Sequence, residues 1–291
     1  PYTGQIPATV RSRLKMCAVV NDGNVMYGPG SYAKVGTVSA GERVIVLQED
    51  GPSQYSYIEY STGKTASKRG YVPNSNLTDV SASFKTVPAP GNAALKREYS
   101  DGVSTETLEY YQFGGGPNVL IAYFAEHGFE DAWAADGWEL AQIGCGVFDR
   151  LYSQKDNLSG WTVYVIPCLN RKGVLNGWTN NGPGRTAVDS GVDINRWFPT
   201  NNFKYYSDAR NWNRASVREG NLLKSFITSK KSSSSVTIAL DVHGWLGYSI
   251  GDAEIGKSFI DQFNCLFSYR ILFPVKSSHF FIYQNRKGKS N

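Results

Sequence analysis

The chain lacks any hydrophobic run that approaches the roughly 20 residues needed to cross a membrane. It also lacks a basic tract, because its 30 lysines and arginines are spread along 291 residues and nearly balanced by 25 acidic residues. The formal net charge is +5 at pH 7. We therefore expect neither a membrane span nor a nucleic-acid partner, whereas a slightly positive surface suits an anionic polymer.

Cysteine and histidine are scarce. The four cysteines, Cys17, Cys145, Cys168 and Cys265, lie far apart, which excludes the closely spaced pairs of a zinc ribbon or a redox motif. Their spacing leaves two alternatives open, buried thiols or one disulfide. Aromatic residues, in contrast, are plentiful at 13%. This level is typical of proteins that contact sugars or extended peptides, and equally of an aromatic β-rich core.

The first eighty residues contain short β-segments broken by turn residues. The candidate strands are residues 34–38, 43–48, 55–60 and 69–72. Glycine and proline recur between them, as expected for tight turns. This spacing predicts a small all-β barrel.

The same region resembles the bacterial SH3 domain. The segments that carry the resemblance are, in order, Asn24–Gly30, Val35–Val38, Gly41–Val44, Gly70–Val72 and Asn76–Leu77. The resemblance implies an SH3-like domain over residues 1–80 that either binds cell-wall peptides or is a structural appendage. Residues 81–92, which contain Pro88 and Pro90, are predicted to form a linker.

Residues 93–291 show longer strands that alternate with helices. The predicted strands are 118–124, 161–167 and 236–242, and the predicted helices are 131–154, 216–231 and 252–269. Such alternation is typical of a domain in which helices cover a sheet. We therefore expect a three-layer α/β domain in this part of the chain.

Two of the three histidines follow apolar strands. His127 comes after the strand at 118–124, and His243 comes directly after the strand at 236–242. Strand ends in an α/β sheet are where catalytic groups gather, and Glu130 lies three residues beyond His127. Two imidazoles and one carboxylate leave a fourth position open on zinc, which is the ligand set of a catalytic site. His-x-x-Glu alone is a weak signal, because the pattern also arises by chance.

The wider sequence resembles the zinc carboxypeptidase family, which includes bacterial peptidoglycan peptidases. Four segments appear in the family's order: His127–Glu130, Ile166–Gly173, Gly191–Pro199 and Asp241–Gly244. They spread over about 120 residues, which makes coincidence a poor explanation. The resemblance implies a three-layer α/β/α zinc carboxypeptidase domain with a mixed sheet, preceded by the small SH3-like barrel.

The resemblance also implies roles for individual residues. His127, Glu130 and His243 would bind Zn²⁺. Asn195 and Arg196 would hold the carboxylate of the substrate, because a guanidinium offers two parallel donors to two oxygens.

Two further residues have roles that rest on the resemblance alone. Arg185 would stabilise the oxyanion of the tetrahedral intermediate, although a capped turn or a surface charge also explains an arginine in such a loop. Tyr283 is a candidate for a substrate-binding tyrosine. His279 is interpreted as an ordinary loop histidine.

The family's general base is the feature that this sequence does not match. In the family a glutamate follows the last histidine ligand by several tens of residues, whereas the last acidic residues here are Asp252, Glu254 and Asp261. These come too early to correspond. We expect the glutamate to lie beyond Asn291, and turnover by this chain to be low, because general-base catalysis contributes ~100-fold or more.

These observations predict a zinc-dependent peptidase that is secreted or associated with the cell wall. The favoured substrate is the stem peptide of peptidoglycan, cleaved at the bond between γ-D-glutamate and the diamino acid. A general metallocarboxypeptidase acting on protein C-termini is an alternative. A catalytically inactive protein that binds the cell wall is a third.

Overall fold

The computed structural model describes residues 14–60, 68–128, 136–176, 194, 218–231, 236–244, 250–251 and 278–284. The chain forms two compact units. Unit 1 contains residues 1–87, 127–138 and 171–191, and unit 2 contains residues 88–126, 139–170 and 192–291.

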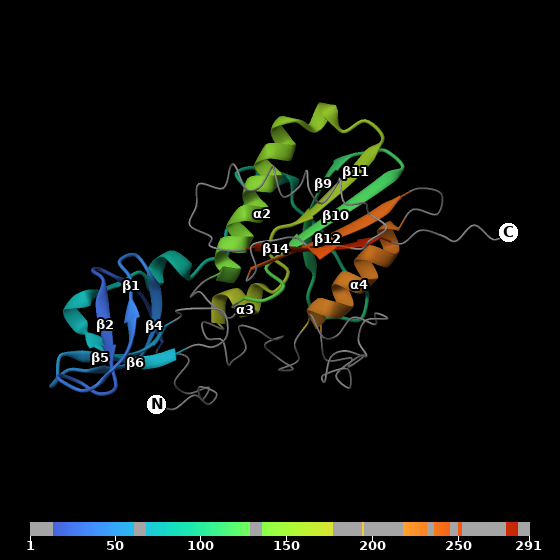
Figure 1. The fold of residues 1–291 in the computed structure, drawn as a ribbon. Helices are drawn as coiled ribbons and strands as arrows, with labels where there is room; N and C mark the ends of the chain where they lie inside the picture. The colour runs from blue at the N-terminus through green and yellow to red at the C-terminus, as the bar shows by residue number, and fades with distance from the viewer. Residues whose placement is uncertain are drawn as a thin grey trace. The chain divides into compact units, whose positions relative to one another are not determined.

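Unit 1 is built on a seven-stranded antiparallel sheet (Figure 1, blue to cyan). Its strands are β1 (Lys15–Val19), β2 (Gly23–Met26), β3 (Lys34–Val38), β4 (Arg43–Asp50), β5 (Tyr55–Tyr60), β6 (Lys68–Pro73) and β7 (Leu77–Asp79). Short 3-10 helices follow β6 and β7, at η1 (Asn74–Asn76) and η2 (Ser81–Phe84). The spatial order of the strands is β3-β2-β6-β5-β4-β1-β7.

The strands of unit 1 bury alternate residues on opposite faces of the sheet. Val44 and Val46 of β4 belong to one buried cluster, while Ile45 between them belongs to another with Met16 and Phe84. This is the two-residue period of an extended strand. Strands that are not neighbours contribute to the first cluster, so the sheet bends around its own core.

A buried ion pair joins two central strands of this sheet. Glu59 of β5 and Arg69 of β6 are direct cross-strand partners. Both Nε and Nη2 of Arg69 approach Oε2 of Glu59, at 2.9 Å and 2.8 Å, and the two side chains are only 2% and 4% exposed. Loss of one partner would leave the other charge buried away from water, which is costly.

We expect Glu59→Gln to lower the free energy of unfolding of unit 1 by about 3–5 kcal/mol, because it removes a negative charge that the buried Arg69 guanidinium contacts. Urea unfolding followed by circular dichroism measures this. The double variant Glu59→Leu/Arg69→Met removes both charges, so it should recover most of the loss. Equal stability of Glu59→Gln and the wild type would contradict a stabilising buried ion pair between Glu59 and Arg69.

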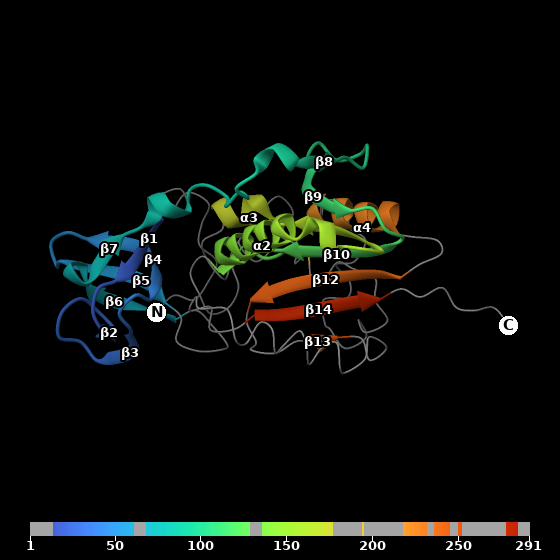
Figure 2. The same cartoon turned by 90° about the horizontal axis from the view of Figure 1, so that it is seen from above.

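Unit 2 is built on a second sheet, which mixes parallel and antiparallel strands (Figure 2). Its strands are β8 (Arg97–Tyr99), β9 (Leu108–Gly114), β10 (Asn118–Phe124), β11 (Trp161–Ile166), β12 (Thr237–Gly244), β13 (Ile250–Gly251) and β14 (Ser278–Gln284), in the order β13-β14-β12-β10-β11-β9-β8. The central strand β10 is parallel to both of its neighbours, β11 and β12. Strands β9 and β14 flank these three in the antiparallel direction.

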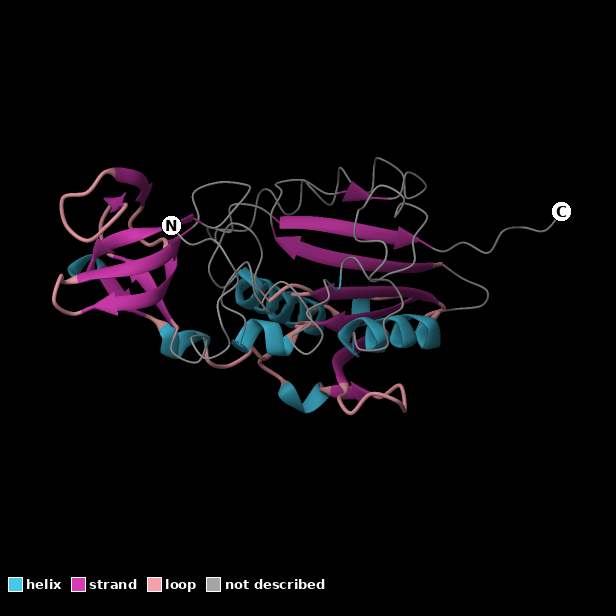
Figure 3. Cartoon of the chain, turned by 90° about the horizontal axis from the view of Figure 1, so that it is seen from below, coloured by secondary structure: helices cyan, strands magenta, loops and turns pink. Residues whose placement is uncertain are grey.

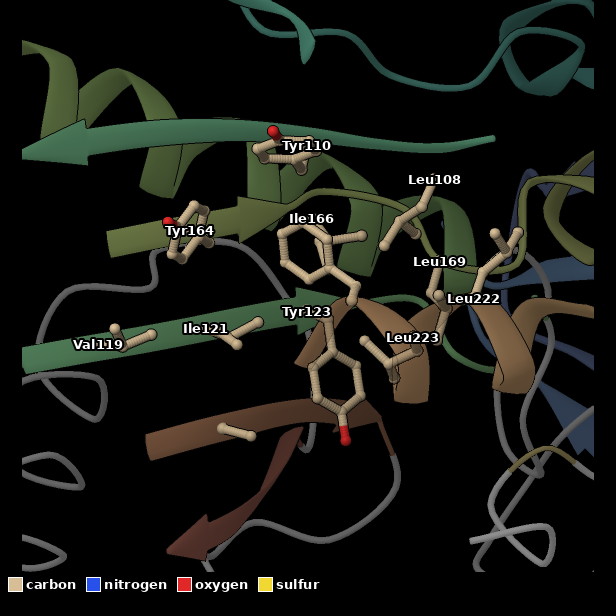
Figure 4. Close-up of a cluster of buried hydrophobic side chains, with 12 residues drawn as sticks. Leu108, Tyr110, Val119, Ile121, Tyr123, Tyr164, Ile166, Leu169, Leu222 and Leu223 are labelled. Atoms are coloured by element: carbon tan, nitrogen blue, oxygen red, sulfur yellow. The ribbon is translucent and has the colours of Figure 1, made fainter. Parts of the chain in front are cut away.

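Two helices pack against the second sheet. The amphipathic helix α2 (Asp136–Ser153) places Phe148 against Tyr111 and Phe113 of β9, with ring centroids 4.6 Å and 5.3 Å apart. Helix α4 (Arg218–Lys230) places Phe226 against Tyr110 of β9, at 4.8 Å. Successive residues of a strand point to opposite faces, so one helix covers each face. Figure 4 shows the cluster that α4 covers.

The predicted fold, a three-layer α/β/α domain preceded in the sequence by a small SH3-like barrel, is wrong. Two seven-stranded sheets dominate the described part of the chain, which contains three α-helices: α2, α3 (Arg171–Asn176) and α4 (Figure 3). Among the described residues, a single long helix lies on each face of the second sheet, instead of the rows of helices that form the outer layers of such a domain. The first sheet is open, because its edge strands β3 and β7 do not pair with one another.

Most of the individual elements that were predicted exist. Strands β3, β5 and β10 have the predicted bounds, and α4 differs from the predicted helix by two residues at its start and one at its end. The strands that were not predicted are β1, β2, β7, β8, β9, β13 and β14, and the helix predicted at 252–269 falls outside the described residues. The domain boundaries at 80 and 92 stay a prediction.

Within the described ranges, no helix is long and apolar enough to cross a membrane. Cys17, Cys145 and Cys168 are buried and form no disulfide there. Burial raises the pKa of the Cys17 thiol to about 11 and that of Cys145 to about 12. These two cysteines are therefore structural thiols rather than nucleophiles.

Candidate functional site

The carboxyl ends of three parallel strands meet at one edge of the second sheet. Tyr123 of β10 pairs with Ile166 of β11, and Phe124 pairs with Val242 of β12. Polar residues begin where the apolar runs stop. His243 follows Val242 within β12, so its backbone lies at this edge.

Backbone hydrogen bonds continue between the chain segments beyond β10 and β11. The amide of Leu169 donates to the carbonyl of Phe124 (2.8 Å), and the amide of Asn170 donates to that of Ala125 (2.9 Å). Ala125 is buried and has a φ of 54°, a conformation that residues other than glycine rarely adopt. Such strain persists only where the surroundings enforce it, and it is enriched at functional sites.

Three polar side chains are buried at the same edge. Tyr123, Glu126 and Asp241 are each less than 9% exposed, and the Tyr123 hydroxyl donates a hydrogen bond to the Asp241 carboxylate. Figure 4 shows the Tyr123 ring extending from β10 toward β12. Burial raises the pKa of Tyr123 well above its ordinary value, and the negative charges of Asp241 and Glu126 raise it further.

The raised pKa of Tyr123 makes stability depend on pH in the alkaline range. Above about pH 10 the unfolded chain loses the phenol proton while the folded chain keeps it, so stability falls as pH rises. We expect this group to contribute a loss of about 1.4 kcal/mol per pH unit between pH 10 and its folded pKa.

Tyr123→Phe should remove that contribution, so its unfolding free energy should fall less steeply above pH 10 than that of the wild type. Denaturant unfolding between pH 8 and pH 11 measures the difference. Tyr152→Phe is the matched control, since this ring lies exposed on α2 and should give a curve parallel to the wild type. Parallel curves for both variants would show that Tyr123 ionises equally in the two states.

The structure describes three of the seven predicted site residues. His127 belongs to unit 1 and is 1% exposed. His243 and Tyr283 are placed by strand register in unit 2. The other four, Glu130, Arg185, Asn195 and Arg196, lie outside the described residues.

Strand register separates Tyr283 from the carboxyl edge and brings another histidine to it. Tyr283 of β14 pairs with Ala239, four residues before His243 and so about 13 Å away along the strand. His279 is the direct cross-strand partner of His243. The interpretation of His279 as a loop residue is therefore wrong, because it lies within β14.

The glycine after His127 is required by close backbone packing. A Cβ on Gly128 would overlap the backbone of Gly173 and Val174, which belong to the same unit. The structure therefore gives a physical reason for a glycine at this position. Any larger residue must displace the segment that carries His127.

We expect Gly128→Ala to lower the free energy of unfolding by about 1–3 kcal/mol, because the clash is with backbone rather than a movable side chain. Thermal and urea unfolding both report this. Gly146→Ala on α2 is the matched control, because open space surrounds its Cβ position. That substitution should stabilise the helix by roughly 0.5–1 kcal/mol. An unchanged free energy of unfolding in Gly128→Ala would contradict the close approach of Gly128 to the backbone of Gly173 and Val174.

The described residues do not by themselves assemble a metal site. They contain no group of three or more histidine, cysteine, aspartate and glutamate side chains placed to hold one ion. The predicted ligand Glu130 is not among them. The zinc centre therefore stays a prediction.

Three buried residues of this edge were not singled out from the sequence: Tyr123, Glu126 and Asp241. A signal for the two acids exists, since Glu126 directly precedes His127 and Asp241 lies two residues before His243. Tyr123 carries no such signal, because a tyrosine at the end of an apolar run looks like any core aromatic residue.

No family model matches the chain. A curated protein named Bacteriocin BCN5, from Clostridium perfringens, is 35% identical over 237 residues, which is 79% of this chain. The chain spans about a quarter (26%) of the length of that bacteriocin. A solved structure from Mesorhizobium loti, described as an aspartoacylase family protein, covers 60% of this chain and 52% of its own, with 18% identity and a TM-score of 0.32. A likeness this slight establishes neither a shared fold nor a shared activity.

Proposed function

We propose that this chain is a zinc-dependent hydrolase that cleaves peptide bonds in the bacterial cell wall. The observation that carries the proposal is the parallel pairing of β10 with β12. The two histidines proposed as ligands, His127 and His243, follow or end these two neighbouring strands in the sequence. Carboxyl ends of adjacent parallel strands are where an α/β sheet collects its catalytic groups.

The residues at hand suit zinc. His127 has a nearly fully buried imidazole, and Gly128 permits the close packing of the segment that holds it. With His243 and Glu130 it would make a set of two nitrogens and one carboxylate, which zinc prefers in catalytic sites. A zinc ion held there would act as the Lewis acid for a scissile carbonyl.

The proposed substrate is a stem peptide of peptidoglycan, cleaved between γ-D-glutamate and the diamino acid. Arg196 and Asn195 would bind the free carboxylate of the peptide, and Arg185 would offer positive charge to the developing oxyanion. The SH3-like resemblance of the N-terminal region favours the cell wall as the target. The similarity to a protein named as a bacteriocin is consistent with action outside the producing cell.

The zinc ligands are testable without any activity. Protein stripped with chelator, reloaded with zinc and dialysed should contain about one zinc per chain by elemental analysis. His127→Ala and His243→Ala should each lose most of it while keeping the circular dichroism of the wild type. His279→Ala is the matched control and should keep its zinc. Full zinc retention by His127→Ala and His243→Ala would exclude this site.

The substrate is tested by comparing two peptides at high enzyme concentration. The proposal expects release of the diamino acid from L-Ala-γ-D-Glu-diaminopimelate in preference to release of the C-terminal residue from an ordinary peptide. Arg196→Lys should lower cleavage by roughly tenfold or more, because a single ammonium replaces two parallel donors. Preferred cleavage of the ordinary peptide would show a general carboxypeptidase. Stoichiometric zinc with cleavage of neither peptide would favour an inactive wall-binding protein.

A further inference from the structure

Unit 1 contains a pocket at the point where strands β2 and β6 of its sheet separate. Strand β2 pairs with β6 at Met26 and Tyr71, and toward Gly23 it pairs with β3 on its other side. Pro73 at the end of β6 has no N–H with which to extend the ladder to β2. The strands diverge from this point and leave a pocket of about 600 Å³.

The lining of this pocket is polar and carries little charge. Its side chains include three asparagines, Asn21, Asn24 and Asn76, together with Asp22. Among the residues that the structure describes, no lysine or arginine lines it. Amides both donate and accept hydrogen bonds, so they match a ligand rich in hydroxyl and amide groups. The single carboxylate disfavours an anionic ligand.

Hydrogen bonds within unit 1 hold these polar groups in place. The backbone amide of Asn21 donates to Oδ1 of Asn76, and Nδ2 of Asn76 donates to the carbonyl of Asn21, both at 2.9 Å. The amide of Ala40 donates to Oδ1 of Asp22 at 2.8 Å. A lining fixed in advance loses less conformational entropy when a ligand binds.

Tyr32 adds a flat apolar surface to the pocket. A Cβ on Gly28 would lie 3.0, 2.8 and 3.0 Å from Cγ, Cδ2 and Cε2 of the Tyr32 ring. Near-equal distances to three consecutive ring atoms place Gly28 against the face of the ring rather than its edge. The ring is nevertheless 56% exposed, so its other face is open to solvent.

We propose that this pocket binds a neutral saccharide unit, an N-acetylated hexosamine of a glycan strand. The apolar face of a pyranose would stack on the open face of Tyr32, while Asn24 and Asn76 would bond to its hydroxyl and acetamido groups. A stem peptide fits less well, because its carboxylates would meet Asp22, and no lysine or arginine is among the described residues of the lining. This inference deepens the cell-wall function proposed above, but it uses none of the zinc ligands.

Titration with tri-N-acetylchitotriose by calorimetry or NMR tests the proposal. The wild type should bind, and Tyr32→Ala should weaken binding at least about tenfold by removing the stacking surface. Asn24→Ala should weaken binding about threefold or more. Tyr27→Ala is the matched control, since Tyr27 is similarly exposed at 58% but does not line the pocket. It should bind as the wild type does.

The same titration on chelator-treated protein separates this site from the zinc centre, because sugar binding should not change when metal is removed. Absence of chitotriose binding to the wild type would overturn the proposal. Equal weakening by Tyr27→Ala and Tyr32→Ala would do the same. The proposal would also be overturned if the protein bound a stem peptide through Tyr32 but did not bind chitotriose. Thermal unfolding of each variant verifies that the exposed substitutions leave unit 1 folded.

Discussion

The parallel register of β10 between β11 and β12 is the constraint on which the carboxyl edge of the second sheet depends. It sets Tyr123 beside Asp241 and Phe124 beside Val242. A slip of one residue would reverse the face of every side chain on the moving strand. Such a slip is costly here, because α2 and α4 bury apolar residues on both faces of the sheet.

Burial of polar groups at this edge costs free energy that the rest of unit 2 offsets. The carboxylates of Glu126 and Asp241 and the phenol of Tyr123 are buried at positions where apolar side chains would avoid the cost of desolvation. The hydrogen bond from Tyr123 to Asp241 recovers part of that cost. Buried polar groups and a left-handed backbone at Ala125, both at the carboxyl edge of the sheet, are more typical of a functional site than of a structural one.

Local signals predicted elements well and their assembly poorly. The strand at 118–124 was found with its exact bounds because it is a continuous apolar run. Strand β9 was missed because Tyr110 and Tyr111 are buried on opposite faces, which removes the alternation that reveals a strand. The fold class was wrong because alternation of strands and helices does not state how many helices cover a sheet. Asp241 could not be linked to Tyr123 without the pairing of β10 and β12, which is non-local.

The pocket of unit 1 also depends on non-local strand pairing, and its chemistry bears on how a wall-binding pocket and a hydrolytic site in one chain would act together. A module tethered to a hydrolase raises the effective concentration of the polymer that it binds, so weak binding is sufficient. If the module bound the same stem peptide that the hydrolase cleaves, each bound peptide would be withheld from the catalytic groups. A pocket built from asparagines and Tyr32 would avoid that competition, because the glycan repeats along the wall and is not the bond that the proposed hydrolase would cut. Recognition of the uncut part of the polymer therefore makes the saccharide the more effective ligand for a tethered module.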